Sequence, residues 1–164
     1  MEEVESEVAE IYLHPGESYF AREPAIIRTI LGSCVGVAFW SARLGVGALT
    51  HSQLPRCPAN AAGLGAAEGR RYVDFAIRDV ARQLDALGAR RTEVQVKLFG
   101  GADVLLVGDA ASTKSSVGKL NCEAAIEVLR DEGFQVIASS LGGTAGLNIR
   151  LDTRTGEVLL RRLS

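Results

Sequence analysis

The sequence predicts an α+β fold in which strands outnumber helices. Segments with the composition or the two-residue alternation of β-strands are more numerous than the two segments with helical periodicity, and glycine-containing turns join several strands directly. The two helices must then pack against a layered, mostly antiparallel sheet. The chain has 164 residues, and we expect a flexible acidic N-terminus over residues 1–10 and a single domain over residues 11–164.

Three consecutive strands are predicted near the N-terminus. Residues 25–31 and 35–40 are rich in β-branched and aromatic side chains, and Gly32 and Ser33 separate them. Residues 44–50 follow after a short turn, so the second and third strands are expected to form a hairpin.

A long loop and a helix are expected next. Residues 55–69 are rich in Ala, Gly and Pro without periodicity, and an irregular loop of this length in a compact domain is frequently functional. Residues 70–87 repeat apolar side chains at helical spacing, and Gly88 is placed to end the helix.

The second half of the chain adds further strands and one helix. Residues 93–99 alternate apolar and polar side chains, as a half-buried strand does. A helix is expected from about Asn121, as its N-cap, to Gly133. Further strands are expected at residues 134–140, 147–151 and 158–163, with the last two joined through a turn at residues 152–156.

Charge, hydropathy and cysteine spacing exclude several classes of protein. Lys and Arg number 18 against 20 Asp and Glu, so the chain lacks the basic surplus that general nucleic-acid binding requires. The longest uncharged stretch, residues 133–149, is too polar and too rich in glycine for a membrane span. Residues 1–10 are acidic and have no apolar segment, so no secretory signal is expected. Three widely spaced cysteines indicate a reduced, cytoplasmic protein.

A thiol and an imidazole are expected to meet at one end of the hairpin. Cys34 and His51 each lie eight residues from the turn at residues 42–43, which places them opposite each other. His51 can then take the thiol proton, and the thiolate can attack an acyl carbon to give a thioester that water resolves. Backbone amides near Gly32 and Ser33 can stabilise the oxyanion. We also expect His51 to depress the pKa of the Cys34 thiol.

The other histidine and cysteine residues are expected to have structural rather than catalytic roles. A strand cysteine is more often part of the core, so the spacing alone leaves that interpretation of Cys34 open. His14 is expected in a turn, Cys57 in a loop and Cys122 at an early position of the second helix. No ligand pairs occur at short spacing, so we expect no metal site, and thioester chemistry requires no cofactor.

Several short motifs occur in a characteristic order. They are Thr29-Ile-Leu-Gly-Ser-Cys34-Val, Gly47-Ala-Leu-Thr-His51-Ser-Gln-Leu-Pro55, Arg71-Tyr-Val-Asp74, Lys97-Leu-Phe-Gly-Gly101-Ala, Val117-Gly-Lys-Leu-Asn121, Leu141-Gly-Gly143 and Asp152-Thr-Arg-Thr-Gly156-Glu-Val. In this order, over residues 11–163, they resemble the CheD family of chemoreceptor glutamine deamidases. The ordered set is much more specific than any one motif.

The resemblance implies an activity, a fold and partners. The activity is hydrolysis of particular glutamine side chains on the cytoplasmic helical bundle of methyl-accepting chemotaxis receptors. Thioester chemistry also permits methylesterase activity on the same receptors, because ammonia and methanol differ only as leaving groups on the same acyl carbon. The fold is a layered α/β/β sandwich with two main helices on one face, similar to the deamidating domain of cytotoxic necrotising factors. The family resemblance also implies control by CheC, the phosphatase of the phosphorylated response regulator.

The resemblance further implies roles for individual residues. Cys34 is the nucleophile and His51 the general base and acid. A threonine shortly before the cysteine is the third residue, and Thr29 is the only one available here. In a regular strand an odd offset would put Thr29 and Cys34 on opposite faces, unless a bulge at Gly32-Ser33 intervenes. Thr50 is the alternative, although as the strand neighbour of His51 it should point away.

Departures from the family pattern leave other functions open. Gln53 stands where the family usually has a bulky apolar residue, and Thr144 follows the second glycine pair where an asparagine is usual. The alternatives are a CheD scaffold that binds CheC or receptors with little catalytic activity, and a hydrolase of a small amide. The Gly- and Ala-rich residues 59–69 are expected to flank the cleft.

Overall fold

The computed structural model describes residues 8–58, 63–103 and 116–163. The strands within these ranges are β1 (Ala9–Tyr12), β2 (Ser18–Ala21), β3 (Ala25–Leu31), β4 (Val35–Ser41), β5 (Val46–Thr50), β6 (Val94–Gly100), β7 (Val136–Leu141), β8 (Leu147–Asp152) and β9 (Val158–Arg162). The α-helices are α1 (Ala66–Gly69), α2 (Val73–Ala86) and α3 (Val117–Asp131), and a 3-10 turn spans Arg91–Glu93. No helix within the described ranges is long and apolar enough to cross a membrane.

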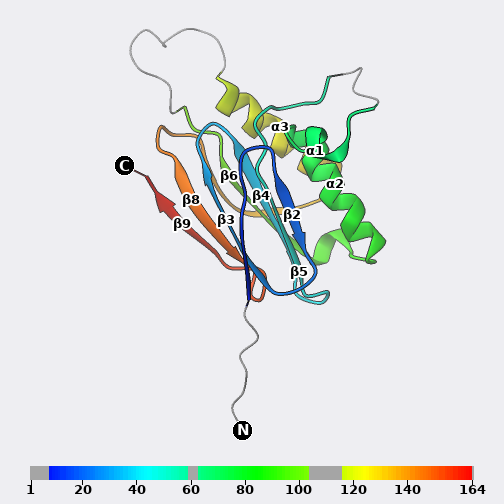
Figure 1. Ribbon diagram of the computed structural model, residues 1–164. Coiled ribbons are helices and arrows are strands. Elements are labelled where there is room, and N and C mark those ends of the chain that lie inside the picture. The colour runs from blue at the N-terminus through cyan, green and yellow to red at the C-terminus, as the bar shows by residue number, and fades with distance from the viewer. Residues whose placement is uncertain (1–7, 59–62, 104–115, 164) are drawn as a thin grey trace.

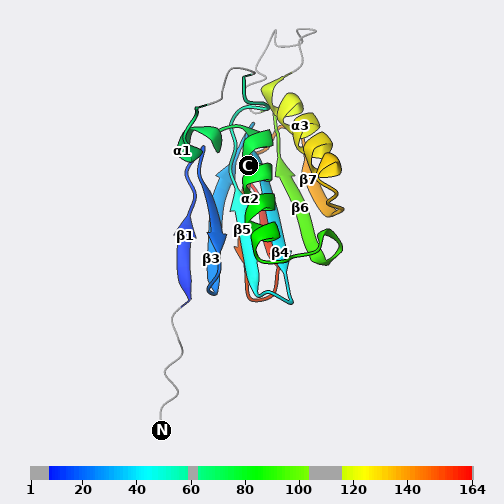
Figure 2. The ribbon, with the colours of Figure 1, turned by 90° about the vertical axis from the view of Figure 1, so that its right-hand side faces the viewer.

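The strands form two sheets that pack face to face. The outer sheet has the order β1-β3-β8-β9 and the central sheet has the order β2-β5-β4-β6-β7. Only the β1–β3 and β6–β7 pairs are parallel; the other neighbours are antiparallel. Helices α2 and α3 cover the face of the central sheet that points away from the outer sheet (Figures 1 and 2). The predicted α/β/β layering with two main helices on one face is confirmed.

Two apolar cores explain the layering. One lies between the helices and the central sheet and contains Val37, Phe39 and Ile77; the other lies between the two sheets and contains Ala38 and Ile27. Strand β4 contributes to both cores because it lies in the middle layer, so nearly all of its residues are buried. Strand β3 has only one buried face over most of its length, and there buried and exposed residues alternate.

Several element boundaries differ from those predicted. Strands β1 and β2 were not expected, because four-residue strands at sheet edges show too little alternation to be recognised. Residues 66–69 of the expected loop form the short helix α1, and residues 59–62 lie outside the described ranges, as do residues 1–7 of the expected N-terminal segment. Helix α3 begins at Val117 rather than near Asn121, because the Ser116 side chain caps it by accepting a hydrogen bond from the Lys119 amide at 3.1 Å.

The chain changes sheets between β3 and β4. Strand β3 belongs to the outer sheet and β4 to the central sheet, so the three strands predicted near the N-terminus are not neighbours in one sheet. The crossover consists of Gly32, Ser33 and Cys34, and no bulge within a single strand is involved. Gly100 at the end of β6 has a φ of 103°, and a side chain there would collide with the carbonyl of Cys34. This close backbone approach accounts for the first glycine of the Gly100-Gly101 pair.

Candidate active site

Thr29 and His51 meet between the two sheets. Thr29 is on the inward face of β3 in the outer sheet, and His51 directly follows β5 in the central sheet. Both are buried, and Thr29 Oγ1 lies 2.6 Å from His51 Nδ1. Because the chain has changed sheets, the odd offset between Thr29 and Cys34 does not separate them. The alternative residue, Thr50, instead accepts a hydrogen bond from the Val37 amide at 3.0 Å and does not contact the imidazole.

The hydroxyl of Thr29 determines which nitrogen of His51 carries the proton. Thr29 Oγ1 donates its single proton to the carbonyl oxygen of Leu13 at 2.8 Å, and a carbonyl can only accept. Toward His51, Thr29 must therefore act as the acceptor, so Nδ1 carries the imidazole proton. Nε2 is left with its lone pair and can act as a base.

The backbone of His51 is fixed by the segment before β2. The His51 amide donates to the carbonyl of Glu17 at 3.0 Å, and the His51 carbonyl accepts from the amide of Gly16 at 2.8 Å. These bonds extend the β2–β5 pairing past the end of β5. The imidazole is thus held both through its ring and through its main chain.

Cys34 lies at the same end of the sandwich as His51. Val35 and Ser52 exchange two backbone hydrogen bonds of 3.0 and 2.9 Å. This register places Gly36 opposite His51, so the predicted direct pairing of Cys34 with His51 is wrong by two residues. A shift of two keeps both side chains on the same face, where they are diagonal neighbours. Cys34 packs against the core between the sheets, and no hydrogen bond of the described residues joins its thiol to His51.

Burial leaves both side chains neutral. It raises the pKa of the Cys34 thiol above its ordinary value, against a smaller lowering by the hydrogen bond from the Cys34 amide. Burial lowers the pKa of His51 to about 4, against a smaller raising effect from the charge of Glu17. The expected depression of the Cys34 pKa is therefore not found, because a neutral imidazole supplies no positive charge to favour a thiolate. A reaction at this thiol would therefore need a base to take its proton, and His51 is the candidate.

The buried His51 leads us to expect a loss of stability in acid. Its folded-state pKa of about 4 lies below the ordinary value of 6.5, so between these values only the unfolded chain binds the proton. The free energy of unfolding should therefore fall as the pH decreases from about 6.5 to about 4, by up to about 3 kcal/mol from this group. Urea unfolding at about pH 7 and about pH 4.5 measures the fall.

The matched control for this prediction is His51→Asn, which retains a donor for Thr29 but does not titrate. In this variant the free energy of unfolding should decrease much less between about pH 7 and about pH 4.5 than it does in the wild type. The same pH dependence in both proteins would show that His51 is not the group responsible.

The carbonyls and the amides of the crossover residues differ in their hydrogen bonding. Their carbonyls are occupied: that of Gly32 accepts from the Ala102 amide and that of Cys34 from the Gly101 amide, each at 2.9 Å. Among the described residues, the amides of Gly32 and Ser33 donate to no acceptor, and the Cys34 amide bonds its own thiol. Free amides beside a nucleophile can stabilise a developing oxyanion. Gly32 and Ser33 therefore remain the candidates for this role.

Asn121 is a site residue that the sequence interpretation missed. It is fully buried within α3, and its Nδ2 donates to the carbonyls of Ser33 at 3.0 Å and Gln53 at 3.1 Å. One side chain thus connects the residue before Cys34 to the residue two after His51. Because both partners are carbonyls, the amide nitrogen must point toward them, and Oδ1 has no partner among the described residues. The motif Val117-Gly-Lys-Leu-Asn121 contained the signal, but Asn121 was interpreted as a helix cap.

Glycine allows α3 to lie close enough for this contact. A Cβ on Gly118 would be 2.6 Å from the carbonyl oxygens of both Gly101 and Ala102. Helix α3 therefore packs directly on the backbone that follows β6. This approach brings Asn121, one turn later, to the crossover.

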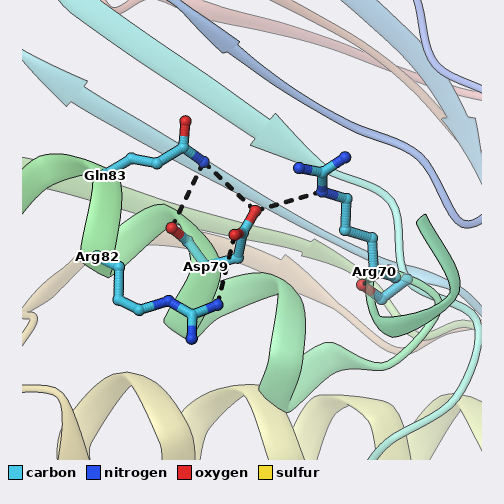
Figure 3. A network of polar contacts seen from close by, with 5 residues as sticks. Arg70, Asp79, Arg82 and Gln83 are labelled. Carbon is cyan, nitrogen blue, oxygen red and sulfur yellow. Dashed lines mark hydrogen bonds and ion pairs between the residues drawn. The ribbon is translucent and has the colours of Figure 1, made fainter. Parts of the chain in front are cut away.

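A polar network supports the segment after His51 from the helix side. Ser52 Oγ donates to the carbonyl of Arg70 at 3.0 Å, and Arg70 Nε donates to Asp79 of α2 at 3.3 Å. Asp79 also accepts from Arg82 and Gln83, as Figure 3 shows. The network connects α2 to the residue that follows the imidazole.

The other sequence candidates lie outside this constellation. His14 stacks edge-on against Tyr12, and the Cys57 amide donates to the Asp74 carboxylate at 2.9 Å. The Cys122 thiol lies 3.9 Å from the carbonyl of Gly100 in a packing contact, and burial raises its pKa. Within the part of the chain that the structure describes, no group of His, Cys, Asp and Glu is arranged to hold a metal ion.

Comparison with known proteins shows similarity to one family over most of the chain. A family model described as CheD chemotactic sensory transduction matches residues 54–162, a stretch that begins after Thr29, Cys34 and His51. The chain is 38% identical over 154 residues to a probable chemoreceptor glutamine deamidase CheD 2 of Geobacter sulfurreducens, covering 94% of this chain and 90% of the relative. It is 33% identical to a probable chemoreceptor glutamine deamidase CheD of Maridesulfovibrio salexigens, covering 99% of this chain and 97% of the relative.

Solved structures with a similar fold are more distant in sequence. The hypothetical protein YfiH of Bacillus licheniformis superposes with a TM-score of 0.51 at 11% identity, over 77% of this chain. YlmD of Geobacillus stearothermophilus superposes with a TM-score of 0.50 at 12% identity, over 76% of this chain. The chain spans about half the length of each of these proteins, 51% and 50%. This similarity concerns the fold alone.

Proposed function

Since this chain belongs to the CheD family, we propose that it is a chemoreceptor glutamine deamidase. It hydrolyses particular glutamine side chains of methyl-accepting chemotaxis receptors to glutamate and releases ammonia. The observation that supports this most directly is the buried Thr29–His51 pair at the end of the sandwich where Cys34 directly precedes β4. The relatives' names supply the substrate, and the residues present supply chemistry suited to an amide.

The reaction begins with proton transfer from the Cys34 thiol to His51 Nε2. The sulfur then attacks the side-chain carbonyl carbon of the glutamine, and the amides of Gly32, Ser33 and Cys34 stabilise the oxyanion. As the intermediate collapses, the carbon–nitrogen bond breaks and His51 returns its proton to the leaving ammonia. Thr29 acts through His51 by holding the proton on Nδ1, so that Nε2 remains the base.

Water completes the reaction from the thioester. A water molecule gives a proton to His51 Nε2 and attacks the acyl carbon, the carbon–sulfur bond breaks, and the thiol regains its proton. The products are glutamate and free enzyme. A methylated glutamate would follow the same course with methanol as the leaving group, so methylesterase activity on the same receptors is part of the proposal.

Partners and location follow from the proposed substrate. The enzyme would act in the cytoplasm on the helical signalling domain of the receptors, and CheC would regulate it. We expect Gln53 and Thr144, which depart from the family pattern, to alter these contacts. Gln53 has its side chain next to Arg71, at 3.3 Å from Nε.

The direct test is ammonia release from a purified receptor signalling domain, with mass spectrometry to locate each conversion of glutamine to glutamate. Ammonia release together with conversion at defined glutamines is the expected result. If the wild-type protein binds receptors or CheC but releases no ammonia from several receptors, with or without CheC, the deamidase proposal fails. The alternative of a binding module on the same scaffold would then hold.

Asn121 is expected to act as a positioning residue in this reaction. Asn121→Leu keeps a side chain of similar size but removes both donors to the Ser33 and Gln53 carbonyls. We expect kcat to fall by about tenfold to a hundredfold with a smaller change in KM, because a misplaced reacting group costs rate more than binding. The rate of Cys34 alkylation by iodoacetamide, measured as a function of pH, follows the ionisation of the thiol independently of the substrate.

The control is Cys122→Ala, which truncates the next residue of α3 and leaves both carbonyls bonded. It should lower stability without changing the pH profile of alkylation. If Asn121→Leu changes stability alone, with kcat and the alkylation profile as in the wild type, Asn121 has only a structural role.

A further inference from the structure

None of the helices that the structure describes covers the outward face of the outer sheet, because α2 and α3 lie on the far side of the central sheet (Figures 1 and 2). Arginines from three neighbouring strands gather on this face. A pocket of about 410 Å³ is lined by Arg28, Asn148, Arg150, Leu159, Leu160 and Arg161, and we refer to these six residues as the arginine face.

The three guanidinium groups are close neighbours without an acidic partner. Arg28 is directly opposite Arg150 in the β3–β8 register, and Arg161 is a diagonal neighbour of Arg150 on β9. None of the three forms an ion pair with a described residue. Asp152, two residues after Arg150, is engaged by Arg154 at 2.8 Å. Like charges opposite each other destabilise a sheet, so a bound anion would relieve this repulsion.

Apolar side chains extend this surface beyond the reach of a small anion. Tyr12, Ile30 and Leu159 are 46%, 44% and 51% exposed and point outward from the same sheet. Arginine and tyrosine are enriched in surfaces that bind proteins, and the exposed Ile30 and Leu159 add apolar area beside them. A phosphate ion would neutralise the arginines but leave the apolar side chains in water. The matching occupant is therefore an acidic protein segment that also carries apolar residues.

The position of the arginine face connects it to the reaction. Successive residues of a strand point to opposite faces, so β3 directs Thr29 inward to His51 and Arg28 outward. The outward face also continues along β3 toward the crossover at Gly32. We propose that the arginine face docks an acidic segment of the protein substrate while a glutamine of the same substrate reaches Cys34. This inference rests on the proposed deamidase function for the identity of the substrate.

The proposed docking has a consequence for the order of events. Each turnover converts a neutral amide into a carboxylate, which adds to the acidic charge of the substrate. A receptor segment with some glutamines already converted should therefore bind the arginine face more tightly than the unconverted segment. Raising the salt concentration should weaken this difference.

The test compares the double variant Arg28→Glu/Arg150→Glu with the wild-type protein on a purified receptor signalling domain. We expect KM for the domain to rise by about tenfold or more with kcat within about twofold, because docking is removed and the chemistry is untouched. The double variant should also bind a receptor domain that carries glutamate in place of its target glutamines more weakly than the wild type does, by a factor similar to the rise in KM. The matched control, Arg22→Glu/Arg130→Glu, changes the net charge equally at exposed residues away from this face and should resemble the wild type.

The outcomes separate this inference from the function on which it rests. If the wild type releases ammonia but the double variant has unchanged KM and binding, the docking inference is wrong. The same conclusion follows if the double variant loses only self-association, or only phosphate binding, while its KM for the domain stays normal. If the wild type binds the domain through these arginines but releases no ammonia, the deamidase proposal fails and the docking surface stands.

Discussion

Replacing Cys34 with alanine is expected to reduce deamidation of a receptor domain by at least about a thousandfold. The variant keeps the fold, because Cys34 is only partly buried at the edge of the core and donates no hydrogen bond to a described residue. What it removes is the sulfur atom that is proposed to form the thioester. Ammonia release measures the loss, and the amides of Gly32 and Ser33 are left without an intermediate to stabilise.

The control for Cys34→Ala is Cys57→Ala, which removes another partly buried thiol at a residue outside the reaction path. Cys57→Ala should release ammonia at the wild-type rate. Both variants should have an unfolding midpoint close to that of the wild type. Substantial ammonia release by Cys34→Ala would exclude a thioester mechanism. The nucleophile would then have to be a group other than the Cys34 thiol.

Thr29→Val is the second change with a large expected effect. Valine has nearly the shape of threonine, but it leaves the Leu13 carbonyl and His51 Nδ1 without their partner. The proton on Nδ1 is then no longer held, and Nε2 is a base for only part of the time. We expect kcat to fall by about a hundredfold, together with a loss of stability of about 1–3 kcal/mol from the unpaired buried groups.

A second buried threonine provides the matched control for this change. Thr50→Val also removes one buried hydroxyl, the acceptor of the Val37 amide, so it should cost a similar amount of stability. It leaves the imidazole bonded, so its kcat should stay within about threefold of the wild type. Thr29→Ser, which keeps the hydroxyl, should recover most of the activity. If Thr29→Val and Thr50→Val reduce kcat equally, both reductions result from the loss of stability, and Thr29 does not act through His51.

Local patterns predicted most elements of the fold. The alternation of β6, the helical spacing of α2 and the turn between β8 and β9 are properties of short segments, and the structure has all three where they were expected, to within a few residues. The assignment of strands to sheets is not local. Strands β3 and β4 are separated by three residues and both have strand composition, and nothing in that composition shows that they belong to different layers.

The candidate site was predictable to a similar degree. Cys34 and His51 follow from the hairpin, whose register was wrong by two residues because the turn is longer than the sequence suggested. Thr29 required the resemblance, since strand geometry argued against it. Asn121 depends on how closely α3 approaches the backbone after β6, and that distance is set by Gly118 in a contact between distant parts of the chain.

The change of sheets at Gly32–Ser33–Cys34 makes the site a sensor of how the two layers are packed. Thr29 belongs to one layer and His51 to the other, so their 2.6 Å contact exists only while the layers are locked together. A compact state that kept both sheets but loosened their packing would retain its strand content and lose this contact, and with it the proposed base. A ligand that changes how the layers pack is therefore expected to change the proposed activity without touching Cys34.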